Sequence, residues 1–171
     1  FDISDAKLNN KLNGITNFTK DTIVELRDTI WAMNHNEITF EDLKSRIYNF
    51  IEKAKESKEN IDFIFNIDEQ LNDVKFSSVV GMNIYRTIQE AINNAIKHAN
   101  ASQIKVQISK EQDQISIQIL DNGDGFDLEN VSKNNGLTNM ESRISSINGD
   151  FKIETNPATG TKISILLNKT T

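Results

Sequence analysis

The sequence predicts an α+β protein, a two-layer α/β sandwich with a mixed, mostly antiparallel sheet, preceded by an N-terminal helical segment. Apolar residues recur at helical steps in the first third of the chain, and several later runs alternate as strands do. Five of the seven glycines and the only proline lie between Gly123 and Gly160. Helices followed by a strand–helix–strand–strand–helix–strand–strand order are typical of helices packed on an antiparallel sheet.

Two helices are expected within residues 1–58. In the first, apolar residues recur every three or four positions, as in Leu8, Leu12, Ile15, Leu26, Ile30 and Met33. Residues 34–37 predict a turn, and Thr39 is a suitable N-cap for the second helix. That helix repeats the spacing at Phe40, Leu43, Ile47, Phe50 and Ala54. The pair predicts an αα-hairpin or a fragment of a helical bundle.

The second domain is expected to cover residues 59–171. A strand-like run at 61–67 precedes a helix from about Met82 to Ala99, whose apolar face carries Ile84, Ile88, Ala91 and Ala95. Residues 104–108 and 115–119 alternate strictly and predict two strands joined by a hairpin turn at 110–114. A helix over 137–147 follows, and then two closing strands at 150–155 and 161–167, joined by 156–160.

Composition excludes several classes of function. The net charge of −6 gives no basic face, so nucleic acid is not an expected partner. The chain has no cysteine, which excludes disulfides, thiol nucleophiles and iron–sulfur clusters, and two histidines cannot form a three-histidine metal site. No apolar run approaches ~18 residues, so no membrane contact is expected. A chain that begins at Phe1 suggests a piece of a longer protein.

Glu90, Asn94 and Lys97 are spaced to share one face of the 82–99 helix, away from its apolar stripe. A solvated polar face is the simple interpretation. The functional interpretation is a row of groups facing a ligand, because Mg²⁺ takes only one or two protein oxygens and completes its shell with water and phosphate. Lys97 would then act as a point charge on a phosphate.

Asp121 comes at the end of a strand, and Gly123 and Gly125 after it give the backbone freedom. A tight polar turn is one interpretation. A calcium loop is another, but the required glycine position would be Phe126 and the bidentate glutamate position would be Ser132. The third is a nucleotide pocket, in which a buried carboxylate accepts from the amine of adenine and meets the carbonyl of guanine without a proton to share.

Gly136 lies at the start of the helix that follows, where exposed N–H groups and the helix dipole favour phosphate. Gly160 and Thr161 lead into the last strand in a similar way. Taken alone, each feature is weak evidence for a phosphate site, because an ordinary helix N-terminus explains the first and a hairpin loop explains the second.

The four segments QEAINNAIKHA (89–99), DNGDGF (121–126), NGLTNM (135–140) and GT (160–161) are specific as an ordered set. The set resembles the ATP-binding domain of the GHKL superfamily, and sensor histidine kinases of two-component systems most of all. The resemblance covers roughly residues 60–168 and implies the Bergerat fold with three helices. ELRDTIWAM (25–33) is similar to the second helix of the dimerisation and histidine-phosphotransfer domain in nitrate-sensor and thermosensor kinases.

The resemblance implies roles for residues on the phosphate side. Asn94 would ligate Mg²⁺, and Glu90 would orient the nucleophile and serve as the catalytic residue. Lys97 and His98 would contact the phosphates. The amides of Gly136 and Leu137 would bind the phosphates as well.

The resemblance also implies roles on the base side. Asp121 would bind the adenine amine, with Thr161 nearby through a water. Gly123 and Gly125 would let the backbone approach the base, and Phe126 would join the nucleotide contacts. Residues 127–135 would form a short ATP lid.

The phosphoacceptor histidine of this family, followed by Asp or Glu, is missing. His35 precedes Asn36, and His98 belongs to the nucleotide helix. We therefore expect a histidine kinase fragment that binds ATP and Mg²⁺ without phosphorylating itself. Residues 1–58 would be the C-terminal part of the dimerisation domain.

The resemblance further implies that the parent is a homodimer through these helices and passes the phosphoryl group to a response regulator. The fragment would be the cytoplasmic portion of a membrane-anchored bacterial sensor. The alternatives are a non-kinase GHKL ATPase or ATP-controlled dimerisation module, a degenerate scaffold, and an anti-sigma-factor serine kinase.

Overall fold

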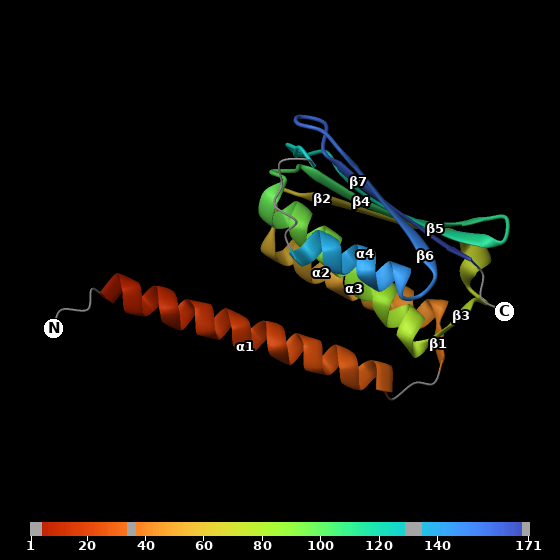
Figure 1. Ribbon diagram of the computed structural model, residues 1–171, viewed down its shortest axis with the longest axis horizontal. Helices are drawn as coiled ribbons and strands as arrows, with labels where there is room; N and C mark the ends of the chain where they lie inside the picture. Colours follow the sequence, from red (N-terminus) through yellow and green to blue (C-terminus); the bar gives the residue numbers. More distant parts are fainter. Residues whose placement is uncertain (1–4, 34–36, 129–134, 169–171) are drawn as a thin grey trace. The chain divides into compact units, whose positions relative to one another are not determined.

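The computed structural model describes residues 5–33, 37–128 and 135–168. The chain divides into two compact units, residues 1–36 and 37–171. The first unit contains the long helix α1 (Asp5–Met33), shown in Figure 1. The second unit holds the described sheet strands and the remaining helices, and each unit is considered by itself.

The second unit begins with the short strand β1 (Glu37–Thr39) and the helix α2 (Phe40–Ser57). The next elements are β2 (Asp62–Ile67), a 3₁₀ turn η1 (Glu69–Leu71), β3 (Lys75–Ser77) and α3 (Ser78–His98). The chain continues through β4 (Gln103–Glu111), β5 (Gln114–Asp121), α4 (Asn135–Ser145), β6 (Gly149–Thr155) and β7 (Thr161–Asn168).

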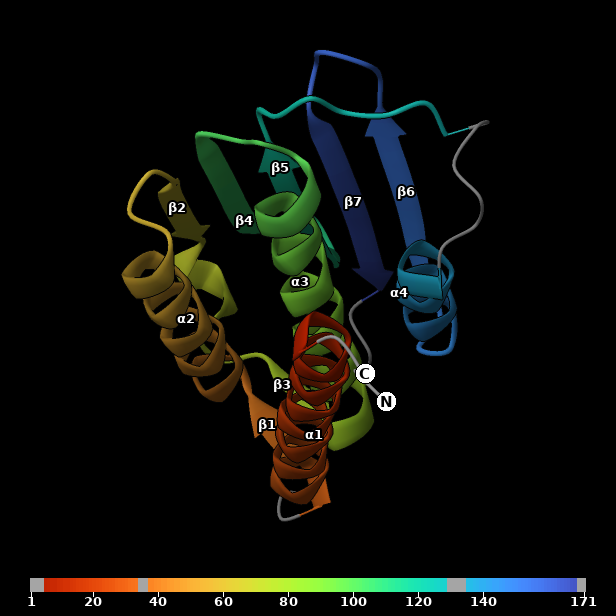
Figure 2. The ribbon, with the colours of Figure 1, turned by 90° about the vertical axis from the view of Figure 1, so that its left-hand side faces the viewer.

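A five-stranded sheet forms one layer of this unit, in the order β2-β4-β5-β7-β6. The β2–β4 pair is parallel and the other three pairs are antiparallel. The helices α2, α3 and α4 lie over one face of the sheet, as Figure 2 shows. The predicted two-layer sandwich with a mixed, mostly antiparallel sheet is thus confirmed.

The core lies between the sheet and its helices. On β4 and β5 the alternating residues are buried, namely Ile104, Val106, Ile108, Ile115, Ile117 and Ile119. The apolar face of α3 meets them with Ile84, Ile88, Ala91 and Ala95, all buried. The period-two and helical patterns of the sequence therefore identified the core-facing side of β4, β5 and α3 correctly.

Two details differ from the sequence-based expectation. The helix α3 begins at Ser78 rather than near Met82, because the Ser77 side chain accepts a hydrogen bond from the Val80 N–H and caps it. The strands β1 and β3 were not predicted. They are three residues each and pair antiparallel with one another, which is too short for alternation to be visible in the sequence.

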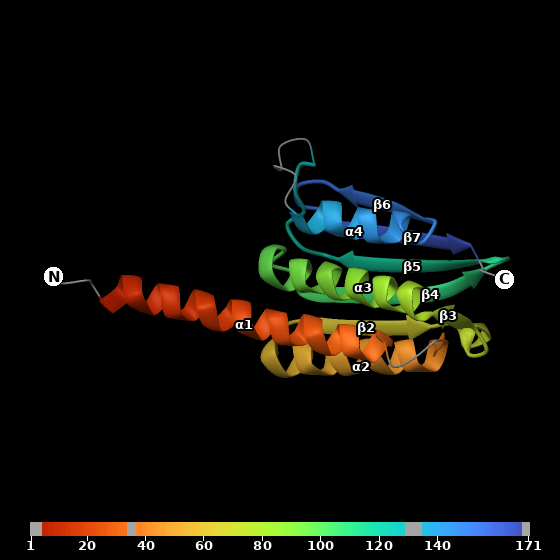
Figure 3. The same ribbon diagram turned by 60° about the horizontal axis from the view of Figure 1, so that its bottom comes forward.

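The position of α2 differs from the expected domain division at residues 58 and 59. This helix belongs to the second unit and packs against α3 and β2, and Figure 3 shows it beside β2. Its buried face includes Leu43, Ile47 and Ile51. An amphipathic pattern shows that a helix has a partner but not which one, and here the sheet domain supplies a partner for α2.

The helix α1 exposes apolar side chains along its length. Leu8, Leu12, Ile15, Leu26 and Ile30 are each at least half exposed. None of the helices in the described part of the chain is both long and apolar enough to cross a bilayer. The predicted turn at 34–37 lies largely outside the described residues.

The placement of α2 makes a prediction about truncated chains. A fragment of residues 37–171 should unfold cooperatively, whereas a fragment of 59–171 should lose cooperative unfolding, because the surfaces of α3 and β2 that α2 covers become exposed. Each large apolar side chain of α2 contributes about 1.5–3 kcal/mol by burial. Thermal unfolding followed by circular dichroism checks this. Equal stability of the two fragments would contradict the assignment of α2.

Candidate functional site

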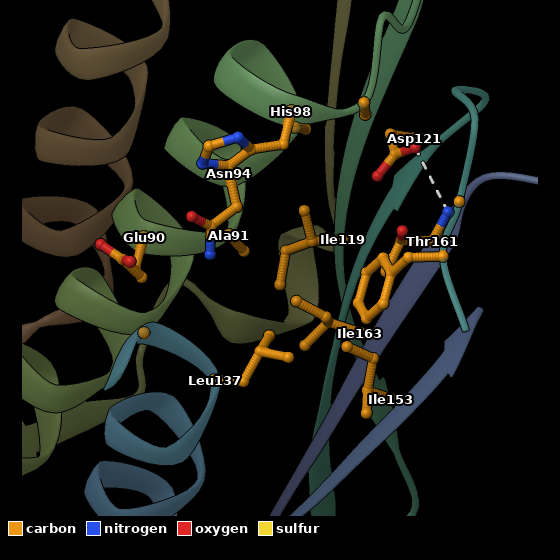
Figure 4. A pocket seen from close by; sticks show the side chains of 15 residues that line it. Glu90, Ala91, Asn94, His98, Ile119, Asp121, Leu137, Ile153, Thr161 and Ile163 are labelled. Atoms are coloured by element: carbon orange, nitrogen blue, oxygen red, sulfur yellow. Dashed lines mark hydrogen bonds between the residues drawn. The ribbon is translucent and has the colours of Figure 1, made fainter. Parts of the chain in front are cut away.

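A cavity of about 330 Å³ opens between the C-terminal half of α3 and the sheet. Its walls come from α3, the ends of β5, β6 and β7, the loop after β5, and the start of α4. The volume lies in the range of about 300–1,000 Å³ that is usual for small-molecule sites. Figure 4 shows polar side chains on two opposite walls, with apolar side chains between them.

The α3 wall carries Glu90, Asn94 and His98, one helical turn apart. Glu90 and Asn94 are half-buried and His98 is exposed. The sequence placed the polar row away from the apolar stripe, but Ala91 and Ala95 line the same cavity. Both faces contribute because the small alanine side chains leave space between the helix and the sheet.

Asp121 lies on the opposite wall, as the last residue of β5. Its Oδ1 accepts hydrogen bonds from the backbone N–H of Gly123 at 3.0 Å and of Thr161 at 3.2 Å. The bond to Thr161 is drawn in Figure 4. Within the described residues Oδ2 has no hydrogen-bond partner. The carboxylate is thus fixed through one oxygen and can accept from a ligand through the other.

The loop after Asp121 passes very close to neighbouring backbone. A Cβ on Gly123 would lie 2.0 Å from the Ala99 carbonyl oxygen, so a larger residue would displace the loop from α3. Gly125 has φ of +60°, a left-handed conformation that glycine adopts without strain. Glycine is therefore required at both positions for different reasons.

Thr155 joins this loop to the β6–β7 turn and was not predicted. Its buried hydroxyl donates to the Gly160 carbonyl at 3.0 Å and accepts from the Phe126 N–H at 3.1 Å. The Thr161 hydroxyl lies 3.3 Å from it. A lone threonine at the end of a strand gives no distinguishing signal in the sequence, which explains the omission.

The start of α4 closes the third side of the cavity, where Gly136 and Leu137 both line it. A Cβ on Gly136 would lie 2.7 Å from Oε1 of Glu90 and 3.7 Å from Nδ2 of Asn94. The N-terminal turn of α4 thus lies beside two polar side chains of α3, and the N–H groups of a helix N-terminus are suited to binding an anion.

An apolar row on the sheet completes the cavity. Ile119, Ile163 and Ile153 are directly paired across β5, β7 and β6. Their neighbouring side chains form an apolar surface on which the flat face of a ring can lie. The alternating pattern marked Ile119 as a core residue, but only the strand register brings the three together beside Asp121.

The structure brings most of the predicted site residues to this one cavity. Its lining includes Glu90, Asn94, His98, Asp121, Gly125, Phe126, Gly136, Leu137 and Thr161. Lys97 is exposed on the last turn of α3 and does not line it, and Gly123 packs against Ala99 instead. The predicted lid at 127–135 lies mostly outside the described residues, as does His35.

Comparison with protein families gives one match that covers more than half of the chain. The family model described as "Histidine kinase-, DNA gyrase B-, and HSP90-like ATPase" matches residues 80–171. The matched segment contains most of α3, the loop after β5, the start of α4 and β7, which together form most of the cavity wall.

Curated relatives are sensor proteins. The chain is 33% identical over 96 residues to the sensor protein VraS of Staphylococcus haemolyticus, a match covering 56% of this chain and 28% of VraS. It is 27% identical over 164 residues to a sensor-like histidine kinase of Chloroflexus aurantiacus, covering 92% of this chain and 27% of that protein. The chain thus spans little more than a quarter of these relatives.

Solved structures share the fold. The Acinetobacter baumannii histidine kinase AdeS matches with a TM-score of 0.70 and 17% identity, over 100% of this chain and 88% of that one. The catalytic domain of the histidine kinase ThkA matches with a TM-score of 0.63 and 20% identity, over 78% of this chain and 95% of that one.

Proposed function

Because the chain belongs to the family of histidine kinase-, DNA gyrase B- and HSP90-like ATPases, we propose that its cavity binds ATP as the phosphoryl donor of a sensor histidine kinase. The observation that carries this proposal is the position of Asp121 and Asn94 on opposite walls of one cavity. The Asp121 carboxylate can bind a nucleobase, and the Asn94 amide can bind the metal ion on a phosphate. An apolar surface lies between them.

The base side of the proposed site is built around Asp121. Its Oδ2 accepts a hydrogen bond from the amine of adenine, while the isoleucine row of β5, β6 and β7 supports the ring. Guanine presents a carbonyl at the same position, and two acceptors facing each other repel, so adenine is favoured. Thr161 contributes through a water, and Gly125 and Phe126 bring the loop to the rim.

The phosphate side lies between α3 and the start of α4. The N–H groups of Gly136 and Leu137 would bind the phosphates, and His98 and the more peripheral Lys97 would add donors. Glu90 orients the attacking nucleophile. Transfer of this kind depends mainly on positioning and on neutralising charge.

The residues present could hold Mg²⁺ through a single side chain, Asn94. Within residues 5–33, 37–128 and 135–168, no group of three or more His, Asp or Glu side chains could hold a metal ion. A cation held by the Asn94 amide oxygen, the phosphates and waters needs no such group. When bound, Mg²⁺ supplies neutralisation of charge on the phosphate oxygens.

The whole protein is proposed to be a sensor kinase of a two-component system. The γ-phosphoryl group would pass from ATP to a histidine nitrogen, with ADP as the leaving group, and then to an aspartate of a response regulator. The helix α1 would belong to the dimerisation domain, and its exposed Leu8, Leu12, Ile15, Leu26 and Ile30 support a homodimer through that face. The site would operate in the cytoplasm, where ATP is available.

The first prediction concerns the base. Asp121→Asn should weaken binding of a non-hydrolysable ATP analogue by about 1–3 kcal/mol and reduce the preference over the GTP analogue, because an amide leaves a polar group unpaired. Isothermal titration calorimetry measures both affinities. Asp113→Asn, on the exposed β4–β5 turn, is the matched control. Unchanged affinity of the Asp121 variant would count against the assignment.

The second prediction concerns the metal. Asn94→Ala should weaken analogue binding in the presence of Mg²⁺ and have little effect in EDTA, because only the metal-dependent contact is removed. The control is Asn93→Ala, the same substitution one position earlier on α3 at a residue that does not line the cavity. A loss that is equal with and without Mg²⁺ would remove the metal role from Asn94.

The third prediction concerns the reaction. Residues 1–171 should not become labelled with radioactive γ-phosphate alone, whereas a chain extended through the preceding dimerisation helix should form an acid-labile phosphohistidine. The radioactive label that stays on the protein is compared after treatment with alkali and with acid. Phosphohistidine keeps the label in alkali and loses it in acid. Steady release of inorganic phosphate without any phosphoprotein from the extended chain would favour the non-kinase ATPase instead.

A further inference from the structure

Two exposed side chains outside the cavity join the end of α3 to the loop that follows Asp121. The Asn100 carboxamide donates from Nδ2 to Oδ2 of Asp124 at 2.7 Å. Neither residue lines the cavity.

Asp124 is also held through its backbone to two other segments. Its N–H donates to the Ala99 carbonyl at 2.7 Å, at the C-terminal end of α3. Its carbonyl accepts from the N–H of Ala158, in the turn between β6 and β7. One residue of the loop is thus tied both to the helix that bears Asn94 and to the hairpin that bears Thr161.

Asn100 adopts a conformation that suits this contact. Its φ is +50°, in the left-handed region, directly after the C-cap residue Ala99. Asparagine enters this region more readily than other non-glycine residues and is common where helices end. The turn that ends α3 therefore also directs the carboxamide to Asp124.

We propose that Asn100 and Asp124 are positioning residues that set the distance between the α3 wall and the Asp121 wall of the cavity. This inference rests on the proposed function. A ligand that contacts both walls binds more tightly when the distance between them is already set, because less conformational entropy is lost on binding. A ligand that contacts only the base side gains little.

The test compares two ligands on the same variants by calorimetry. Asn100→Gly keeps the left-handed backbone and removes the carboxamide, and Asp124→Ala removes its acceptor. Both should weaken binding of the Mg²⁺ complex of a non-hydrolysable ATP analogue by about 3- to 10-fold, the range for one hydrogen bond. Adenosine contacts only the base side of the cavity, so its binding should weaken by no more than about 2-fold. Asp113→Ala is the control.

A reversed pair supplies a rescue experiment. Asn100→Asp alone places two carboxylates side by side and should weaken analogue binding further. Combining it with Asp124→Asn exchanges donor and acceptor and should restore analogue affinity to within about 2-fold of the unmodified chain. A change confined to melting temperature, with both affinities unaltered, would show a merely structural role and overturn the proposal.

Two further outcomes distinguish a failure of the positioning role from a failure of the proposed function. Equal losses for adenosine and the ATP analogue would indicate damage to the base side and overturn the positioning role alone. Failure of the unmodified chain to bind either ligand would overturn the proposed function and the positioning role together.

Discussion

The hydrogen bonds to Oδ1 of Asp121 are the interaction on which the rest of the cavity depends. Two backbone N–H groups, from Gly123 and Thr161, converge on one oxygen. They join the end of β5, the loop after it and the start of β7 around a single carboxylate. A carboxylate with several such donors is held in one orientation, so its second oxygen faces the cavity at low entropic cost.

The space beside that carboxylate results from a change of side-chain size along α3. At the N-terminal end of the helix, Ile84 and Ile88 fill the gap to the sheet, whereas Ala91, Ala95 and Ala99 leave it open. Protein interiors are close-packed, so a cavity needs such a local deficit of volume. The same apolar stripe therefore builds the core at one end and the site at the other.

The sequence predicted the elements whose signals are local, and the resemblance predicted most of the residues lining the cavity. The ordered set of motifs assigned Asn94 and Asp121 to the same nucleotide site. The isoleucine row was not predicted, because the pairing of Ile119 with Ile163 depends on strand register. The Phe126–Thr155 and Asn100–Asp124 contacts were missed for a similar reason, since each joins segments far apart in the chain. The partner of α2 likewise depends on tertiary packing.

The two units differ in how far their apolar side chains are buried. The sheet domain, with α2 included, buries most of its large apolar residues. Among the described residues of the first unit, the helix α1 has no second element to pack against, and several of its apolar side chains are exposed. A lone helix gains most of its stability from packing its apolar face, so α1 requires a partner surface that its own unit does not supply. A second copy of the same helix, as proposed for the parent dimer, presents an equivalent apolar stripe and meets that requirement.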